Sequence, residues 1–229
     1  MTTAAQVEEW RPDLPGAPSL KQDIDMLGEV LHAVVHTGAG VSFIVPFSIA
    51  EARTFWVDQV LPGVRDRTRR VLVARWDTRI VGTVQIDLAV PPNQQHRAEV
   101  LKLLVHPEAR RHGIARALMT ELESIAQDEG RTLLTLDTWT GGNAESLYRS
   151  MGYIAAGVIP RYARGSLTPE LEPTTIMYKE LSRPAALATP HRTLSLARRG
   201  QGEVEGWRGE ASSAANDLDS RRASARRGR

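Results

Sequence analysis

The chain has 229 residues, 41% of them hydrophobic, which is typical of one globular domain with extensions. It contains no cysteine, so disulfides, thiolate metal sites and a cysteine nucleophile are excluded. The formal net charge of +2 is uneven, because residues 183–229 hold ten Arg against five acidic residues and leave about −3 for residues 1–182.

Hydrophobic periodicity and turn residues divide the chain into predicted elements. Residues 1–19 contain three prolines and are predicted to be an N-terminal extension with an edge strand at 6–11. Ser48, followed three residues later by Glu51, is predicted to begin a helix with a capping box. In the first half of the chain we predict a helix at 21–36, an extended piece at 41–45, the helix that Ser48 begins at 48–60, and a hairpin of strands at 69–76 and 79–90. In the second half we predict a strand at 97–105, a helix at 114–130, a strand at 132–138 and a helix at 144–151. Strands at 153–159 and 174–181 follow, separated by a loop at 160–173.

This order of elements favours an α/β or α+β domain at 20–182, in which helices flank a mixed central sheet. Residues 183–229 are rich in Arg and Ala without a sustained period, so we expect a disordered tail. No aromatic residues interleave the arginines of 221–227, and we expect no specific nucleic-acid partner. No apolar run approaches the ~20 residues that span a bilayer, and no secretory signal begins the chain. We therefore expect a cytoplasmic protein without a membrane partner.

Residues 100–116 combine an apolar strand, a basic turn and the start of an amphipathic helix. Such a strand–glycine turn–helix unit is a recurrent anion site, because the unpaired N–H groups of the first helical turn converge there. Gly113 and Ala115 leave room for a pyrophosphate, and Arg110, Arg111 and Arg116 can add charged hydrogen bonds. Taken alone, the Gly-x-Ala spacing is also compatible with an ordinary connection whose arginines face water.

The spacing Arg110-x-x-Gly113-x-Ala115 after Leu103-x-Val105-x-Pro107 resembles the acetyl-coenzyme A signature of the GCN5-related N-acetyltransferase (GNAT) family. A second family motif follows about thirty residues later, as Ala144-x-x-Leu147-Tyr148-x-x-x-Gly152-Tyr153. The resemblance covers residues from about 20 to 181, and its order of elements agrees with the predicted fold.

The resemblance implies a site for acetyl-CoA, as a co-substrate, on the strand and the basic turn. In the family the strand parts from its neighbour and its backbone pairs with the pantetheine arm. The residues implied for acetyl-CoA binding are Leu103, Leu104, Val105, Arg110, Arg111, His112, Gly113, Ile114, Ala115, Arg116 and, as a substitute, Asn143. This chain departs from the family at one position: the family often has Asn seven residues before the motif tyrosine, where this chain has Gly141, and Asn143 is the candidate substitute.

Acetyl transfer to an amine needs an acid for the departing thiolate and a base for the acceptor ammonium. Tyr148 is the candidate acid, since a phenol with a pKa of ~10 stays protonated at neutral pH. Two carboxylates are candidate bases: Asp137 at the end of an apolar strand, ranked first, and Glu99 on the parting strand, ranked second. Either carboxylate could instead be structural.

His36 and Phe43 belong to the segment that borders the acceptor pocket in this family, and we expect them to bind substrate. His32 and His36 have a zinc-compatible spacing, but no third ligand is apparent, so no metal is expected. The sequence therefore predicts direct acetyl transfer in a ternary complex to a small toxin- or antibiotic-like amine. One alternative is an acetyltransferase that acts on a protein or peptide amine. The other is a non-catalytic module that binds acyl-CoA. A homodimer remains an open alternative to a monomer.

Overall fold

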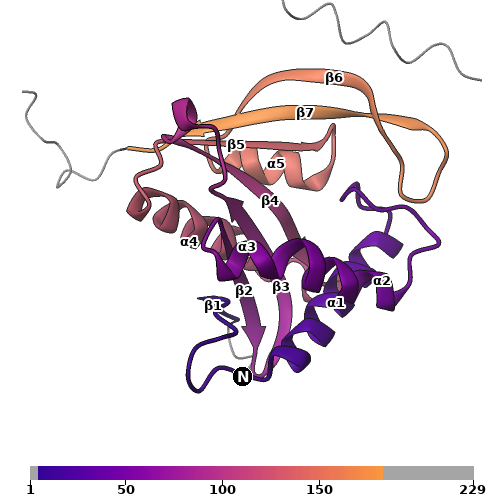
Figure 1. The fold of residues 1–229 in the computed structure, drawn as a ribbon. Helices are drawn as coiled ribbons and strands as arrows, with labels where there is room; N and C mark the ends of the chain where they lie inside the picture. Colours follow the sequence, from indigo (N-terminus) through magenta and orange to yellow (C-terminus); the bar gives the residue numbers. More distant parts are fainter. Residues whose placement is uncertain (1–4, 183–229) are drawn as a thin grey trace, which may run out of the picture. The chain divides into compact units, whose positions relative to one another are not determined.

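The computed structural model describes residues 5–182 (Figure 1), and the prediction for the tail at 183–229 lies outside the described residues. Within this range one seven-stranded sheet has the order β1-β2-β3-β4-β5-β7-β6. Its strands are β1 Gln6–Glu9, β2 Arg69–Trp76, β3 Arg79–Asp87, β4 Arg97–Val105, β5 Leu133–Trp139, β6 Ile154–Arg164 and β7 Leu171–Glu180. The α-helices are α1 Leu20–His36, α2 Ile49–Thr54, α3 Leu61–Arg65, α4 Ile114–Asp128 and α5 Asn143–Ser150, with a π-helical turn at Phe55–Val60 and 3-10 turns at Pro92–Gln94 and Pro107–Ala109. In the part of the chain that is described, no helix has the length and apolarity needed to cross a membrane.

Helices cover both faces of the sheet, and each face has its own hydrophobic core. In β2, Leu72 and Ala74 belong to the core that includes the buried residues of α4, whereas Val71 and Val73 belong to the core that includes those of α1. Successive side chains of a strand point to opposite faces, so burial on both faces explains why this strand is continuously apolar. The predicted fold class, a mixed sheet flanked by helices, is confirmed.

Strands β4 and β5 are parallel neighbours joined through α4, while the other neighbouring pairs in the sheet are antiparallel. Their ladder is short: it begins at the pair Arg97–Leu133 and ends at the pair Glu99–Thr135. Beyond Glu99 the two strands part. The edge of β4 that faces β5 is therefore left without a strand partner along its second half.

On its other edge, β4 has a bulge against β3. Gln85 pairs with Leu101 and Thr83 pairs with Leu104, so two residues of β4 face one residue of β3. Lys102 lies in this bulge with φ +51°, in the left-handed region. A bulge bends its strand and changes the direction in which the following side chains point.

Several predicted local features are confirmed. Ser48 and Glu51 form the capping box of α2, and Gly130 follows α4 with φ +71°. Strands β2 and β3 form the predicted hairpin, whose turn residue Asp77 has φ +53°. The expected edge strand near the N-terminus is present as β1, which pairs with β2.

The helix expected over 48–60 is present, with a π-helical turn at Phe55–Val60. Two predictions of local structure are wrong. The segment 41–45, expected to be extended, contains bends, and Ser42 has φ +74°. The loop expected at 160–173 is instead mostly strand, because β6 continues to Arg164 and β7 begins at Leu171. Pro160 is tolerated there since β6 is an edge strand, where a missing backbone donor leaves no ladder partner unsatisfied.

The β6–β7 hairpin is tied at its tip to the loop between α1 and α2. Ser166 Oγ donates to the carbonyl of Ala39 at 2.5 Å, and the N–H of Val45 donates to the carbonyl of Ser166 at 3.0 Å. These contacts fix the α1–α2 loop beside the place where β4 and β5 part.

Candidate functional site

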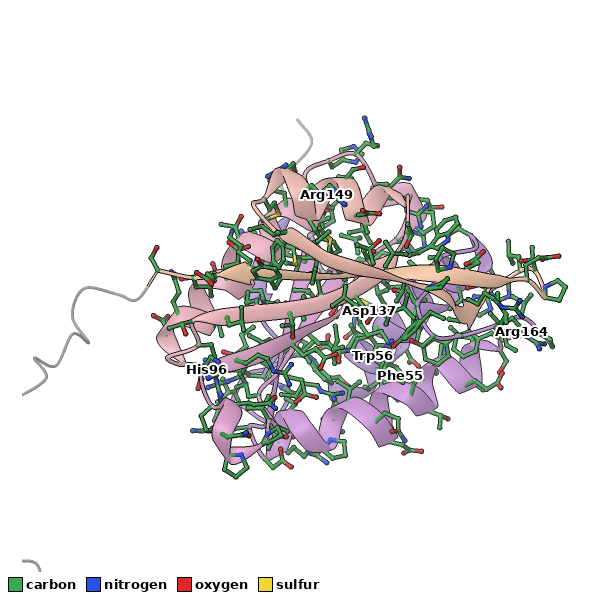
Figure 2. The ribbon with its side chains drawn as sticks, turned by 90° about the horizontal axis from the view of Figure 1, so that it is seen from above. Phe55, Trp56, His96, Asp137, Arg149 and Arg164 are labelled. Carbon is green, nitrogen blue, oxygen red and sulfur yellow. The ribbon has the colours of Figure 1, made fainter. Side chains whose placement is uncertain are left out.

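A cavity of about 400 Å³ opens between the parted strands β4 and β5. The α1–α2 loop, the second half of β4 and the junction of β5 with α5 form its walls. It is lined by residues 37–42, 100–105, 137–139 and 142–144, together with Val34, Arg110, Ala115, Leu147 and Tyr148. The two family motifs read from the sequence thus meet at one cavity. In the view of Figure 2, Asp137 of β5 lies between Arg149 of α5 and the Phe55–Trp56 segment.

The β4 wall of the cavity is an open strand edge. Leu103 and Val105 are half-buried, whereas the side chain of Leu104 is 1% exposed and packs in the core. Leu104 can therefore contribute only backbone groups to a ligand. A free edge of N–H and C=O groups suits an extended chain that itself carries amides, because such a chain can add to the sheet as a further strand.

The glycine turn lies at the N-terminus of α4, as the sequence predicts. Gly113 is the N-cap residue with φ +77°, no side chain caps the helix, and a Cβ at Gly113 would meet no atom within 4 Å. The first-turn N–H groups of α4 are thus free for an anion. Ile114 is 3% exposed and anchors the helix in the core, so its side chain does not face a ligand.

Close packing of α4 against β3 sets where this turn lies. A Cβ at Gly82 would lie 3.1 Å from Ile114 Cγ2 and 3.2 Å from Leu118 Cδ1. Glycine at this position lets the first turns of α4 approach the strand closely. The turn is thereby held beside the end of β4.

The basic residues of the turn have different surroundings. Arg110 lines the cavity and donates to Thr37 Oγ1 at 2.9 Å and, more weakly, to the Val105 carbonyl at 3.4 Å. Arg116 donates to Ser150 Oγ at 2.7 Å at the start of α4. Arg111 and His112 are exposed, and the His112 ring packs edge-on against Trp76 at 4.9 Å. Arg110 and Ala115 line the cavity, whereas Arg111, His112 and Arg116 surround the turn outside it.

Tyr148 and Asp137 line the same cavity from α5 and β5. Tyr148 is 6% exposed, with its ring 5.5 Å from that of Tyr153. Burial raises the pKa of the Tyr148 phenol above its ordinary value, and the negative charge of Asp137 raises it further. Asp137 is exposed to the cavity, and its Oδ2 accepts a hydrogen bond from Thr174 Oγ1 at 3.1 Å.

Glu99, the second candidate base, lies elsewhere. It belongs to the last pair of the β4–β5 ladder, before the strands part, and it does not line the cavity. Its side chain is 45% exposed and lies 3.9 Å from Arg97. Of the two carboxylates, the structure brings Asp137 to the cavity that Tyr148 lines.

Asn143 is the first residue of α5 and lines the cavity, so it can reach a ligand there. Gly141, at the position where the family often has Asn, has φ +78°. Its N–H donates to Glu145 Oε2 at 2.6 Å, and the pKa of Glu145 is lowered chiefly by this hydrogen bond and next by Arg149. Gly141 thus serves to fix the start of α5.

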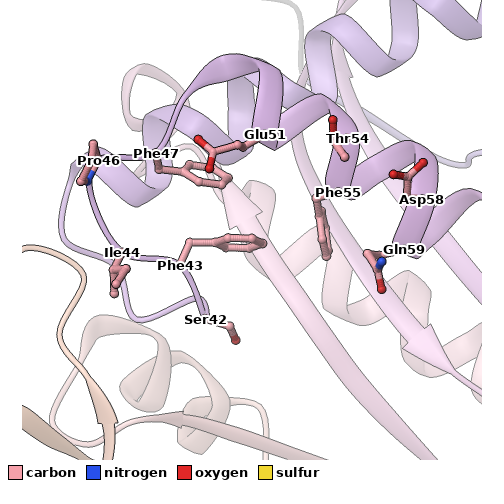
Figure 3. Close-up of a pocket in the computed structure, with 10 residues that line it drawn as sticks. All are labelled: Ser42, Phe43, Ile44, Pro46, Phe47, Glu51, Thr54, Phe55, Asp58 and Gln59. Atoms are coloured by element: carbon pink, nitrogen blue, oxygen red, sulfur yellow. The ribbon is translucent and has the colours of Figure 1, made fainter.

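A second cavity, of about 430 Å³, lies between the α1–α2 loop and the helical segment formed by α2 and the π-helical turn (Figure 3). Phe43 from the loop and Phe55 from the π-helical turn point toward each other, with ring centroids 5.2 Å apart. Phe47 packs on Phe43 at 4.6 Å, and Ser42 borders both cavities. Phe43 therefore lies next to the first cavity. His36 lines neither cavity, and its Nδ1 lies 2.9 Å from the carbonyl oxygen of His32.

Lys102 is a cavity residue that the motif analysis did not assign. Its Nζ donates to Ser42 Oγ at 3.1 Å and lies over the rings of Phe43, at 5.7 Å, and Phe55, at 6.0 Å. Burial lowers the pKa of its ammonium group. The signal was present in the sequence, because Lys102 is the one charged residue within the apolar run 100–105.

Within residues 5–182, no group of three or more His, Asp or Glu side chains is arranged to hold a metal ion. The paired rings of His32 and His36 lie 4.1 Å apart on the surface of α1.

A sequence profile of the acetyltransferase (GNAT) family matches residues 39–153, half of the chain. Human N-acetyltransferase 8 is 36% identical over 87 residues, which are 37% of this chain and 38% of that protein. An N-acetyltransferase from Staphylococcus aureus Mu50 superposes with a TM-score of 0.64 at 18% identity, over 79% of this chain and all of that one. A protein from Salmonella typhimurium, described as an acetyltransferase and solved with its cofactor acetyl-CoA, has a TM-score of 0.59 at 19% identity, covering 80% of this chain and 97% of that one.

The chain belongs to the acetyltransferase (GNAT) family. The match with human N-acetyltransferase 8 spans less than half the length of that protein, and the solved structures establish the shared fold.

Proposed function

We propose that this protein transfers an acetyl group from acetyl-CoA to a primary amine of a small molecule, directly, in a ternary complex. The observation that carries the proposal is the cavity at the parting of β4 and β5, which Asp137 and Tyr148 both line beside the open turn at Gly113. Family membership supports the same reaction class.

The residues along the cavity fit acetyl-CoA, which supplies an activated acetyl thioester. The free edge of β4 from Leu103 to Val105 suits the amides of the pantetheine arm. The unpaired N–H groups that begin α4, with Arg110, Arg111 and Arg116 around them, suit the pyrophosphate. The open space at the Gly113 Cβ position lets phosphate oxygens approach the backbone.

Asp137 and Tyr148 have the chemical properties that the transfer needs. Asp137 accepts a proton from the acceptor ammonium, and the freed lone pair forms the N–C bond as the C–S bond breaks. Tyr148 donates its phenolic proton to the departing sulfur, and its raised pKa keeps it protonated before the transfer. The nitrogen, positively charged once the N–C bond has formed, loses its second proton, which reprotonates the tyrosinate, and Asp137 releases its proton to solvent, so that the amide and the free thiol are left. Thr174 holds Asp137 in place through its hydrogen bond to Oδ2. Glu99 is the less favoured base because it lies outside the cavity.

The acceptor class follows from sequence resemblance within the family. Residues 97–100, 136–138 and 173–176 resemble the corresponding segments of the tabtoxin resistance protein, a tabtoxinine-β-lactam acetyltransferase. We infer from this a small amine of the toxin or antibiotic kind. Both cavities are bordered by the α1–α2 loop, and binding loops of this kind vary with the ligand.

The test measures thiol release from acetyl-CoA with tabtoxinine-β-lactam, aminoglycosides, polyamines, amino acids and a basic peptide as acceptors. The protein adds no thiol background because it has no cysteine. With an active amine, Asp137→Asn should lower kcat by about 10²-fold or more, while the matched change Glu99→Gln should lower it less than about threefold. Turnover of the peptide alone would contradict a small-molecule acceptor, and failure to bind acetyl-CoA would contradict the proposed function as a whole.

A further inference from the structure

We propose that Lys102 binds a carboxylate of the acceptor, so that the acceptor is an amino acid or a simple derivative of one, with its amine toward Asp137. This inference rests on the proposed function and narrows its substrate class.

The bulge in β4 carries Lys102 away from the hydrophobic core under α4. Ala98 and Val100 belong to that core, whereas Leu104 belongs to the core under α1. In a regular strand the side chains of residues 98, 100, 102 and 104 would all lie on one face of the sheet. Because Leu104 lies on the face opposite to Ala98 and Val100, the strand changes its facing between Val100 and Leu104, at the bulge. Without the bulge, Lys102 would share a face with Val100 and place its ammonium among apolar side chains. The left-handed φ of Lys102 is the conformational strain that accompanies this change of direction.

Within residues 5–182 the ammonium of Lys102 forms no ion pair. It contacts the Ser42 hydroxyl and the faces of Phe43 and Phe55, and no carboxylate of these residues lies within 4.0 Å of Nζ. Ser42 occupies one of three N–H donors. A cation that is partly removed from water and has no carboxylate in direct contact is costly, and a ligand carboxylate in contact with it would offset that cost.

The cations of the cavity divide between its two ends. Arg110, at the α4 end, is held by Thr37 and by the Val105 carbonyl. Lys102 is beside Ser42, where the cavity adjoins the phenylalanine-lined pocket. Lys102 from β4 and Asp137 from β5 therefore present opposite charges to one space, and their charges interact. An α-amino acid, with ammonium and carboxylate on one carbon, has the complementary pair of charges.

The second cavity supplies a place for the side chain of such an acceptor. Phe43, Phe47 and Phe55 form an apolar wall of this cavity next to Ser42 and Lys102, and the opposite lining includes Glu51, Thr54, Asp58 and Gln59. An acceptor whose carboxylate contacts Lys102 can place an apolar side chain against the phenylalanine wall. This wall accommodates amino acids with aromatic or long aliphatic side chains.

The experiment compares three matched acceptor sets: L-phenylalanine, L-methionine and L-leucine, each beside its α-amide and its decarboxylated amine. The wild-type protein should use at least one free acid with a kcat/KM about tenfold or more above its amide and amine. Lys102→Met should remove this preference by raising KM for the acid about tenfold or more, with kcat for the decarboxylated amine changed less than twofold. Lys21→Met, at an exposed lysine of α1, is the matched control and should behave as wild type.

Calorimetric binding of acetyl-CoA to the Lys102→Met variant should match wild type, which shows that the cavity is folded. Equal use of acids, amides and amines by the wild type would overturn the inference and leave the acetyltransferase proposal intact. An equal fall of kcat for all acceptors in Lys102→Met would assign Lys102 to proton transfer instead, and would also overturn it. If none of these acceptors is acetylated while another amine without a carboxylate is, the inference is also overturned. If no amine is acetylated, the proposed function is refuted together with the inference.

Discussion

Replacing Tyr148 by Phe tests the proposed general acid by removing a single hydroxyl group. The ring is buried and packs against Tyr153, so a phenylalanine keeps the same shape and contacts. Within residues 5–182 the Tyr148 hydroxyl makes no hydrogen bond to the protein, so its removal leaves no buried partner unsatisfied. We therefore expect the free energy of unfolding to change by no more than about 0.5 kcal/mol.

The effect on turnover should be far larger. A positioned general acid typically contributes about 10²–10⁴-fold. Because Tyr148 is only 6% exposed, bulk water has little access to replace the missing proton donor. We expect kcat to fall by about 10²-fold or more, which corresponds to roughly 2.7 kcal/mol of transition-state stabilisation. The dissociation constant of acetyl-CoA should stay within about twofold.

The assay is steady-state thiol release with an active amine, run beside Tyr153→Phe as the matched control. Tyr153 is a buried tyrosine 5.5 Å from Tyr148 that does not line the cavity, and its replacement should leave kcat within about threefold. Burial holds the pKa of Tyr148 above its ordinary value, so the acid stays protonated and the rate ratio of wild type to Tyr148→Phe should be constant from about pH 6 to 9. An unchanged kcat in Tyr148→Phe, or an equal loss in both variants, would refute the assigned role.

Three further outcomes are expected. Asp23→Ala should lower the free energy of unfolding by about 2–4 kcal/mol in urea titrations, because it removes the buried carboxylate that Arg75 contacts at 2.9 Å and leaves Trp10 Nε1 without its acceptor, while Glu8 stays 2.6 Å from Arg75; a loss below about 1 kcal/mol would contradict this. The pKa of Glu145 is lowered in the folded protein, first by a backbone N–H and next by an arginine, so its stabilisation is present above about pH 4.3 and is lost as the pH falls below it. Glu145→Gln should accordingly flatten the acid limb of stability against pH, and an unchanged limb would show that this carboxylate is unimportant there. Gly113→Ala and Gly130→Ala place Cβ atoms at equally open left-handed positions at the two ends of α4, so each should lower the free energy of unfolding by about 1 kcal/mol. Gly113→Ala alone should raise the dissociation constant of acetyl-CoA, by about tenfold in calorimetry.

Local patterns in the sequence are sufficient for most of the helices and strands. The capping box at Ser48 and Glu51 and the left-handed Gly130 depend on hydrogen bonds and dihedral angles within a few residues, so the sequence predicts them correctly. The Pro and Gly residues of segment 160–173 are poor strand formers, so the sequence predicts a loop there. Pairing between β6 and β7 overrides these preferences, and that pairing is decided between segments rather than within one.

Some residues of the candidate site can likewise be predicted from local sequence, and others depend on the tertiary structure. The sequence by itself determines the two motifs and hence the turn at Gly113, the acid candidate Tyr148 and two candidate bases, of which it ranks Asp137 before Glu99. Only the tertiary structure shows where the β4–β5 ladder ends, which leaves Glu99 inside the sheet and Asp137 at the cavity. It also decides the direction of Lys102, because a bulge exists only relative to the partner strand β3. Both depend on the register between strands distant in sequence, and no local periodicity encodes that register.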